Sequence, residues 1–517
     1  MSAAFSGKTR SSLLALFSVA FLAQSGHGLA SHSGTCDELG AHVPAGILAW
    51  RSGRFSGGLA NPPLGQLLIG AGPVLTGSAD RPLADRPRDL LPARIPVVLL
   101  GLATVLATGA LGRRLGGDLA GLAAAGAAAL SPNLVAHSGL ATLDLPVTAF
   151  ATLAGLAAWT WARTGSRVAL LGWAFAIGSA VMTKFTALHL LLAIPVGAAL
   201  VGPDRWRRPL LLLGAGAAGT FAVSWLAYGP SGGARFALPA GLVDGLVQKF
   251  AHGQEGHLAY LLGRRSADGF SHFFLVALAV KVPLALQVAA LAGGVALVRR
   301  RLPGDVPGFL GFALFPALWI LAAVSLVHRV DIGLRHVLLC FPALLALAGA
   351  GGIALWRSGR GARVVAAGLA LGAMLSAATT TPRHLSYFQR LAGGPARADR
   401  ILIDSNLDWG QEEGLFRSWA AGREVAVNPA RPVAGQVAAN VNALRGALSP
   451  DDSRLRWLRR LEPELRIGDT WRVYRADDER IELATSSAGP VGALDRAWWL
   501  IGTGRAAAAA DLLAHCA

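Results

Sequence analysis

Three carboxylates lie just beyond long apolar runs, in positions that suit acid–base chemistry. Asp37 and Glu38 are adjacent and follow an apolar run over residues 11–29, and Asp144 lies in the stretch SPNLVAHSGLATLDLP. A carboxylate within hydrogen-bond reach of a transferred proton can act as a general base. Two loops that supply acids to one cleft would bring these groups together, so we predict Asp37, Glu38 and Asp144 as catalytic candidates. The alternative is that each is an ordinary hydrated loop carboxylate.

Cationic residues suggest that the same site takes an anionic ligand. Lys184 lies in VMTKFTAL, Arg335 and His336 lie in GLRHVLLC, and Lys281 lies inside the apolar run VALAVKVPLAL. An ionisable residue within a membrane segment indicates a functional site by default. Lysine and arginine bind phosphate by charge, and arginine also by two parallel hydrogen bonds. We predict that these four residues bind a phosphate or diphosphate on a lipid. The alternative is an internal ion pair, for example between Arg335 and Asp331.

The chain that follows Asp37 and Glu38 has features of an ordered loop. AHVPAGILAWRSGRF is a short amphipathic run that suits a helix lying along the membrane interface. Asn61, Pro62 and Pro63 begin an NPPL segment, in which proline favours an extended backbone. We predict that this loop forms a lid or wall beside the acids, with His42, Asn61, Pro62 and Pro63 as its substrate-loop residues. A plain connector is the alternative.

The histidines and cysteines do not have the spacing of a metal site. The sequence contains no HExxH motif and no CxxC pair, which are the usual signals for zinc. His42 follows the paired acids closely enough to share a helix face with them, so a divalent cation is conceivable there. A hydrogen-bonded interfacial histidine is the alternative, and we predict no metal ligands. The three cysteines, Cys36, Cys340 and Cys516, give no disulfide framework.

The elements that must position these residues are membrane helices. The chain has 517 residues, of which 53% are hydrophobic and 15% charged, and its mean hydropathy is +0.48. These values are typical of a polytopic membrane protein. A bilayer core of about 30 Å needs about 20 apolar helical residues. Runs of this kind predict about eleven spans, over 11–29, 91–112, 115–131, 141–162, 167–183, 185–201, 209–228, 271–298, 307–327, 334–355 and 362–379.

The basic residues predict the orientation of these helices. The net charge is +17, but the basic residues cluster between apolar runs and do not form a strip interleaved with aromatic residues, so no nucleic-acid partner is predicted. Basic loops collect on the cytoplasmic side. We therefore predict a cytoplasmic N-terminus and outer segments over 30–90, 132–140, 229–270 and 328–333. The clusters lie at every second connection, at Lys8/Arg10, Arg113/Arg114, Arg163/Arg167, Arg205/Arg207/Arg208, Arg299/Arg300/Arg301 and Arg357/Arg360/Arg363.

The last part of the chain differs from the rest in composition. After about residue 380 the apolar runs shorten and turn-rich stretches appear, such as DSNLDWGQ and NPARP. RILID, EVAVN and TWRVYRA have the pattern of short strands, and RLRWLRRLEPEL is amphipathic. We predict a membrane module over 1–379, in which the outer loop 30–90 carries the acidic motif. A small extracytoplasmic α/β domain over 380–517 would end in a helical hairpin.

Several motifs, in this order, resemble a bacterial family of GT-C superfamily membrane glycosyltransferases. This family is related to the protein O-mannosyltransferases and to the lipid A aminoarabinose transferase, and it retains the first membrane helix. The motifs are DELGAHVPAGILAWRSGRF with NPPLGQLL, SPNLVAHSGLATLDLP, GSAVMTKFTAL, GHLAYLLG with GFSHFFLVALAVKVP, GLRHVLLCFPALL, and LSYFQRLAGGP with DSNLDWGQ.

The resemblance implies roles for particular residues. Asp37, rather than Glu38, would be the catalytic base, and Asp144 would be the acid of the second outer loop. Lys184, Arg335 and His336 fall on motifs near the donor site. Asn61 stands where the family usually has a histidine, which puts a role for that position in doubt.

These observations favour an inverting glycosyltransferase in the bacterial cytoplasmic (inner) membrane. It would move a sugar from a polyprenyl-phosphate donor to an acceptor protein, lipid or glycan at the outer face. Two other functions remain as alternatives. One is a transporter or flippase of lipid-linked sugars, although the sequence shows no internal repeat of the kind many transporters have. The other is a non-catalytic component of envelope glycan assembly that binds the carrier lipid.

Overall fold

The computed structural model describes residues 7–514, apart from 54, 56–60, 84, 203, 230–232, 256, 328–329, 447–453 and 486–489. The chain divides into two compact units. The larger contains Met1–Glu255, Ser271–His328 and Leu334–Gln389, and the smaller contains Gly256–Phe270, Arg329–Gly333 and Arg390–Ala517. The division therefore falls later than the expected boundary after residue 379, and two segments of the predicted outer loops belong to the smaller unit. Cys516 lies outside the described residues.

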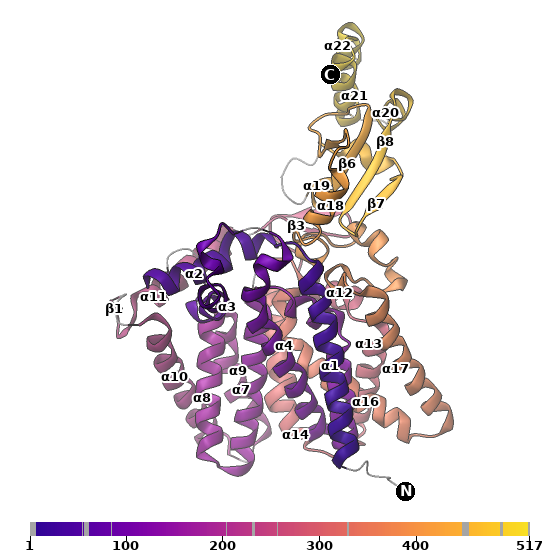
Figure 1. Cartoon of the computed structure of the whole chain (residues 1–517). Coiled ribbons are helices and arrows are strands. Elements are labelled where there is room, and N and C mark those ends of the chain that lie inside the picture. The colour runs from indigo at the N-terminus through magenta and orange to yellow at the C-terminus, as the bar shows by residue number, and fades with distance from the viewer. Residues whose placement is uncertain are drawn as a thin grey trace. The chain divides into compact units, whose positions relative to one another are not determined.

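The larger unit is a bundle of apolar helices (Figure 1). Among the described residues, seven helical segments are long and apolar enough to cross a membrane. They are α1 (Gly7–Ser31), α4 (Pro87–Gly116), α7 (Asp144–Thr164), α10 (Arg207–Tyr228), Val306–Leu326 (α14 and α15), Leu334–Arg357 (a 3-10 helix and α16) and α17 (Arg360–Thr380).

Two further pairs of helices pass the same test only as bent units. The pair α5 (Asp118–Ala129) and α6 (Pro132–Ser138) is bent by 59°, and the pair α12 (Phe273–Lys281) and α13 (Leu284–Val298) by 111°. The remaining two predicted runs form the shorter helices α8 (Arg167–Thr183) and α9 (Leu188–Val201). Each predicted run therefore falls on a helix, and the polytopic α-helical class is confirmed. Seven to nine helical units can span a membrane, so the count of about eleven stays a prediction.

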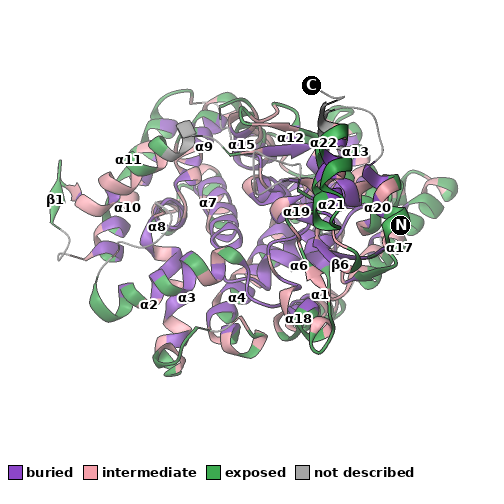
Figure 2. Cartoon of the chain, turned by 90° about the horizontal axis from the view of Figure 1, so that it is seen from above, coloured by how far each residue is buried: buried purple, intermediate pink, exposed green. Residues whose placement is uncertain are grey.

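Small residues allow the central helices to pack closely. In α4, a Cβ added to Gly112 would lie 2.5 Å from the Cβ of Ala124 in α5, and one added to Gly116 would lie 2.6 Å from that of Ala120. Such contacts bring two helix backbones together where lipid supplies no hydrophobic driving force. Seen from above, α7 is mostly buried whereas α17 is mostly exposed (Figure 2). The buried core of the unit therefore surrounds α7.

The first outer segment folds into a compact helical hairpin. A one-turn π-helix, η1 (Glu38–His42), leads into α2 (Val43–Ser52), and α3 (Pro63–Leu75) returns against it. The backbones meet at glycines, since a Cβ on Gly46 would lie 2.2 Å from the carbonyl oxygen of Gln66. The short amphipathic helix is thus present. The NPPL prediction is only half right, because Pro62 is extended but Pro63 begins α3, where its fixed φ suits a first helical position.

Two elements of the predicted outer segment 229–270 are antiparallel ribbons, one in each unit. A two-stranded ribbon of β1 (Ala234–Arg235) and β2 (Leu238–Pro239) leads into the amphipathic helix α11 (Ala240–Glu255). In the smaller unit, β3 (Ala259–Leu261) and β4 (Arg264–Ser266) form a second antiparallel ribbon.

The smaller unit contains a four-stranded mixed sheet in the order β5-β6-β8-β7. The strands are β5 (Ala426–Val427), β6 (Gly435–Asn440), β7 (Leu465–Ile467) and β8 (Trp471–Ala476). EVAVN and TWRVYRA therefore do contain strands. RILID does not, because it lies between the 3-10 helices Pro395–Arg400 and Asp404–Asn406, whose buried polar side chains bond the backbone locally. The amphipathic RLRWLRRLEPEL forms the 3-10 helix Arg456–Arg460 and the start of β7.

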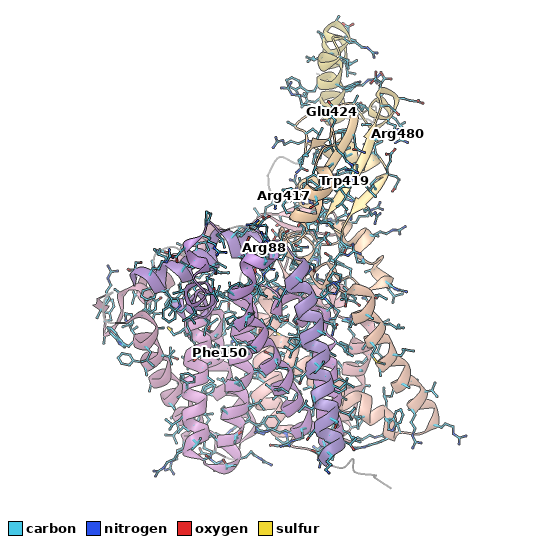
Figure 3. All side chains as sticks on the ribbon, viewed as in Figure 1. Arg88, Phe150, Arg417, Trp419, Glu424 and Arg480 are labelled. Atoms are coloured by element: carbon cyan, nitrogen blue, oxygen red, sulfur yellow. The ribbon has the colours of Figure 1, made fainter. Side chains whose placement is uncertain are left out.

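Helices cover this sheet and complete the unit. Phe416 of α18 (Glu413–Ala420) stacks on Trp471 of β8 with ring centroids 3.6 Å apart. The ring of Trp419, which Figure 3 labels, lies next to that of Phe416. The chain continues through α19 (Val441–Arg445) and α20 (Asp478–Thr485). It then forms two short helices that pack together, α21 (Pro490–Gly502) and α22 (Ala506–Ala514), as the sequence pattern predicted.

Candidate active site

Four charged residues from distant parts of the larger unit form one cluster, which we call the acid–base cluster. Arg335 Nη1 lies 2.6 Å from Asp37 Oδ2 and 3.9 Å from Asp144 Oδ2. Lys184 Nζ lies 2.5 Å from Asp144 Oδ1. Acids and bases therefore alternate in the order Asp37, Arg335, Asp144, Lys184. The side chain of Asp37 is 20% exposed and that of Asp144 only 2%, so Asp37 is the more accessible acid.

Each member of the acid–base cluster stands at the end or start of a helix. Asp37 precedes η1, and Asp144 is the first residue of α7. Lys184 is extended, with φ of −155° and ψ of 131°, between α8 and a 3-10 turn, Phe185–Ala187. Arg335 lies in the 3-10 helix Leu334–Cys340. Helix ends carry unpaired backbone groups, whereas helix middles face lipid or neighbouring helices, so the sequence places these charges where the cost of burying them is lower.

The surroundings of Asp37 keep it ionised. Burial alone would raise the pKa of the Asp37 carboxyl, but the Arg335 guanidinium beside it more than offsets burial and holds that pKa below its ordinary value. The carboxylate is therefore charged at neutral pH. This is the protonation state that a general base requires.

Glu38, adjacent to Asp37, belongs to a different set of contacts, which we call the clamp. It is fully buried, and Arg94 of α4 donates to both of its oxygens, from Nε to Oε1 at 2.7 Å and from Nη2 to Oε2 at 2.8 Å. The backbone N–H groups of Thr35 and Ala141 also donate to it, at 2.9 and 2.7 Å. Arg94 further donates to the carbonyl oxygens of His32 and Ser33. This environment argues against the catalytic role expected for Glu38.

The clamp has a structural consequence for the acid–base cluster. It joins the segment before Asp37 to Ala141, three residues before Asp144, and to α4. The contacts of Glu38 thereby anchor the chain beside both acids of the cluster. Its predicted catalytic role stays a prediction.

Lys281 ends α12 at the sharp bend before α13, and its side chain is buried. Its Nζ donates to the carbonyl oxygen of Leu385 at 2.8 Å and lies 4.8 Å from the ring centroid of Phe388. These contacts secure the bend to the segment that follows α17. The predicted role of Lys281 in phosphate binding stays a prediction.

Two predicted histidines lie around the acid–base cluster. His42 ends η1 and interacts electrostatically with Asp37 and Asp144, and burial lowers the pKa of its imidazole to about 4. It is therefore neutral at pH 7. His336 interacts electrostatically with Lys184 and Arg335, and its ring meets that of Phe274 edge-on. Among the described residues, Nδ1 of His42 and Nε2 of His336 are buried without a hydrogen-bond partner, which leaves both atoms available to a ligand.

Lys249 of α11 is a cation near the site that the sequence analysis missed. It interacts electrostatically with Lys184, Arg335, Asp144 and Asp37, and burial lowers the pKa of its ammonium group to about 8. No described carboxylate forms an ion pair with it. Its place on an amphipathic helix of a predicted outer segment was the available signal, since a lysine there runs against the positive-inside pattern.

The predicted substrate-loop residues Asn61, Pro62 and Pro63 lead directly into α3. A Cβ on Gly65, early in this helix, would lie 2.5 Å from Leu143 and 3.0 Å from Thr183. Those two residues precede Asp144 and Lys184. The start of α3 therefore packs beside the acid–base cluster, and this contact is made by Gly65 rather than by Asn61.

A metal centre has no clear basis in these side chains. Within the described parts of the chain, no group of three or more His, Cys, Asp or Glu residues could hold a metal ion. The two acids of the cluster pair instead with Arg335 and Lys184.

Comparison with known proteins gives the fold a family context. Residues 86–228 match the family model of dolichyl-phosphate-mannose-protein mannosyltransferase. ArnT from Cupriavidus metallidurans bound to undecaprenyl phosphate has a similar structure, with a TM-score of 0.51 and 19% identity over 71% of this chain and 64% of that chain. The apo state of ArnT from the same organism gives a TM-score of 0.50 and 15% identity over 90% and 97%. No curated protein sequence matches significantly.

These findings confirm the expected fold. The chain has an ArnT-like GT-C fold, and residues 86–228 are similar to the protein mannosyltransferase family model. It spans just under two thirds of the ligand-bound ArnT chain and nearly all of the apo chain.

Proposed function

We propose that this multi-span membrane protein with the GT-C fold is an inverting glycosyltransferase. It would transfer a sugar from a polyprenyl-phosphate donor to an acceptor at the outer face of the cytoplasmic membrane. The observation that carries the proposal is the acid–base cluster, in which a partly exposed carboxylate, Asp37, adjoins cations suited to a phosphate. ArnT, whose fold this chain shares, binds undecaprenyl phosphate.

The proposed reaction assigns a separate role to each member of the cluster. Asp37 removes the proton from the acceptor hydroxyl or amine as that group attacks the anomeric carbon. A new glycosidic bond forms, and the bond between the anomeric carbon and the phosphate oxygen breaks. The electron pair leaves with the polyprenyl phosphate, whose charge Arg335 and Lys184 stabilise, while Lys249 attracts the donor phosphate into the site. Attack from the face opposite the phosphate inverts the anomeric centre.

Arg335 gives this mechanism a resting state. Without donor, its guanidinium pairs with Asp37 at 2.6 Å and lowers the pKa of that carboxyl. A donor phosphate would compete for the same guanidinium, because phosphate and carboxylate use the same donors. As Arg335 turns toward the phosphate, the pKa of Asp37 rises and the carboxylate becomes a stronger base. Donor binding would thus activate the base.

An apolar cavity beside α3 suits the hydrocarbon tail of such a donor. It has a volume of about 260 Å³ and lies between the α2–α3 hairpin and helices α8 and α10. Trp50, Leu64, Leu67, Phe175 and Leu226 are among its lining residues. Because the start of α3 also packs beside the acid–base cluster, a phosphate at the cluster and a tail in this cavity would need only a short path between them.

The proposed orientation follows from the charges. The acid–base cluster lies at helix ends opposite the arginine-rich connections, and basic connections favour the cytoplasm. The N-terminus would therefore be cytoplasmic, and the region after α17 extracytoplasmic.

The direct test is sugar transfer by membranes that contain the wild-type protein or the Asp37→Asn variant at matched expression. The variant keeps the shape and hydrogen-bonding capacity of the side chain but not the base, so transfer should fall about 10²–10⁴-fold. Asp80→Asn is the control, because Asp80 is an exposed acid of the same outer segment that pairs with Arg51. Undiminished transfer by Asp37→Asn would remove Asp37 from the mechanism.

Two further measurements separate this proposal from its alternatives. Vesicles reconstituted with the wild-type protein should form a glycosidic bond, whereas lipid movement without a new bond would support the transporter or flippase. Envelope glycans should change in both a deletion strain and an Asp37→Ala strain. A change in the deletion strain alone would support the non-catalytic carrier-lipid-binding component.

A further inference from the structure

A second cavity lies at the arginine-rich end of the bundle, at the other end of the span Leu334–Arg357 from Arg335 of the acid–base cluster. It has a volume of about 710 Å³ and is bounded by α13, α16 and α17, which pack against one another (Figure 1). This volume is in the range of pockets that hold small ligands. We call this cavity the inner groove.

The inner groove follows one face of α13. Its lining includes residues at helical spacing, i, i+3, i+4, i+7 and i+8, namely Val288, Leu291, Ala292, Val295 and Ala296. Eleven residues at about 1.5 Å each give the stretch from Val288 to Arg299 a length of about 16 Å. Alanines of α16, Ala350 and Ala354, form the opposite wall. The small side chains leave room for a long, narrow apolar ligand.

A tight crossing fixes the two helices beside this opening. A Cβ added to Gly293 of α13 would lie 2.1 Å from the carbonyl oxygen of Leu347, and one added to Gly351 of α16 would lie 2.0 Å from that of Ala289. The backbones already touch there, so α13 and α16 cannot close the groove by moving together. The inner groove therefore stays open because the close contact of α13 and α16 at these glycines fixes their separation.

Three arginines stand at the mouth of the inner groove. Arg299 and Arg301 follow α13, and Arg357 lies in the last turn of α16. None of them forms an ion pair with a carboxylate in the part of the chain that the structure describes. At the same end of the bundle, by contrast, Arg10 pairs with Asp118, and Arg163 Nε lies 3.1 Å from Asp305. The three arginines thus leave an uncompensated positive charge beside an apolar slot.

We propose that the inner groove binds an anionic glycerophospholipid of the cytoplasmic leaflet. One acyl chain would lie along α13, and the lipid phosphate would meet Arg299, Arg301 and Arg357. Leu291 and Val298, on and just beyond this face, are highly exposed, so the groove is open to the lipid phase and a ligand can enter from the bilayer. A water-soluble anion would gain nothing from the apolar walls. Basic pockets between helices on the cytoplasmic side suit acidic headgroups.

Native mass spectrometry of the full-length protein in detergent tests the proposal. The probes are phosphatidylglycerol, phosphatidylcholine and undecaprenyl phosphate, each added to delipidated protein. Wild type should retain phosphatidylglycerol in preference to the other two. Each arginine near a phosphate adds attraction, so replacing all three by glutamine should weaken phosphatidylglycerol binding about a hundredfold.

Two variants make the result specific to the groove. Ala354→Phe keeps every arginine but fills the slot, and it should also reduce phosphatidylglycerol binding. The charge-matched control replaces three exposed arginines of other connections at the same end, Arg167, Arg205 and Arg207, by glutamine and should bind as wild type does. Equal loss in this control, or unchanged binding in both groove variants, would overturn the proposal. Preferential retention of undecaprenyl phosphate would overturn the choice of ligand.

Discussion

Asp37 and Glu38 are neighbours in the chain, yet their carboxylates differ in burial and in partners, because Glu38 belongs to the clamp and Asp37 to the acid–base cluster. Glu38 is fully buried, both of its oxygens are bonded, and its arginine partner is itself held by two backbone carbonyls. Asp37 is partly exposed, and its arginine partner is shared with a second acid. An ion pair whose hydrogen bonds are all used can hold a structure but has nothing left for a substrate. A pair with shared, accessible partners can exchange them.

The largest expected effect is on stability, and it tests the clamp. Glu38→Gln leaves Arg94 buried without its counter-charge, so the free energy of unfolding should fall by about 3–5 kcal/mol. Asp37→Asn should change it by about 1 kcal/mol or less, because that pair is partly exposed. Thermal or denaturant unfolding in detergent measures both, with Asp80→Asn as the control. Equal destabilisation by the two variants would show that the Glu38 and Asp37 ion pairs contribute equally to stability, contrary to this prediction.

The next effect concerns the two arginines. Arg335→Gln should lower kcat/KM for transfer about 10²–10³-fold, because it removes a group that stabilises the leaving phosphate. Its melting temperature should stay near that of wild type. Arg94→Gln should instead lower the melting temperature, and the protein that remains folded should keep its activity. If Arg335→Gln lowered the melting temperature but transferred sugar at the wild-type rate, Arg335 would have a structural role like that of Arg94.

A third effect is the response of stability to acid. His32 in the clamp and His42 beside the cluster both have a pKa lowered to about 4 by burial, against 6.5 ordinarily. Between these values the unfolded chain binds more protons, so stability is lost as the pH falls from 6.5 toward 4. Each histidine should cost about 1.4 kcal/mol of stability at pH 5.5 relative to neutral pH.

Single replacements separate the two contributions in melting curves between pH 7.5 and 5. His32→Gln and His42→Gln should each flatten the curve. If melting temperature fell with pH as steeply in both variants as in wild type, the burial of these two rings would not be the cause of the acid sensitivity.

The smallest effect is on donor binding and concerns Lys249. Its pKa is lowered to about 8, so its charge is present below that pH and lost above it. Donor KM should therefore rise as the pH passes about 8. Lys249→Gln should raise KM about fivefold at pH 7, leave kcat nearly unchanged and remove this pH dependence. A lower kcat with unchanged KM would place Lys249 outside donor binding.

Much of the site could be anticipated because its signals are local. An acid after an apolar run, a lysine in VMTKFTAL and an arginine in GLRHVLLC stand out against the composition of a membrane helix, where charge is costly. Lys281 stood out for the same reason, but its partners, Leu385 and Phe388, are a hundred or so residues away. Lys249 was missed because a lysine on an amphipathic helix is common. Residue type and position in the sequence therefore identify candidate site residues, but they do not identify the residues that these candidates contact.

The sequence by itself determined the class of the protein, the helical runs and the end of the bundle at which the acids lie, because hydropathy and charge act through the membrane on each segment separately. Only the tertiary structure decided what each acid does. Consecutive residues of a helix point about 100° apart, so Asp37 and Glu38 face different neighbours. Asp37 meets an arginine 298 residues away and Glu38 one 56 residues away. Such distant pairings depend on the packing of the whole bundle, and that packing leaves the Asp37 carboxylate partly exposed while it buries the Glu38 carboxylate in hydrogen bonds.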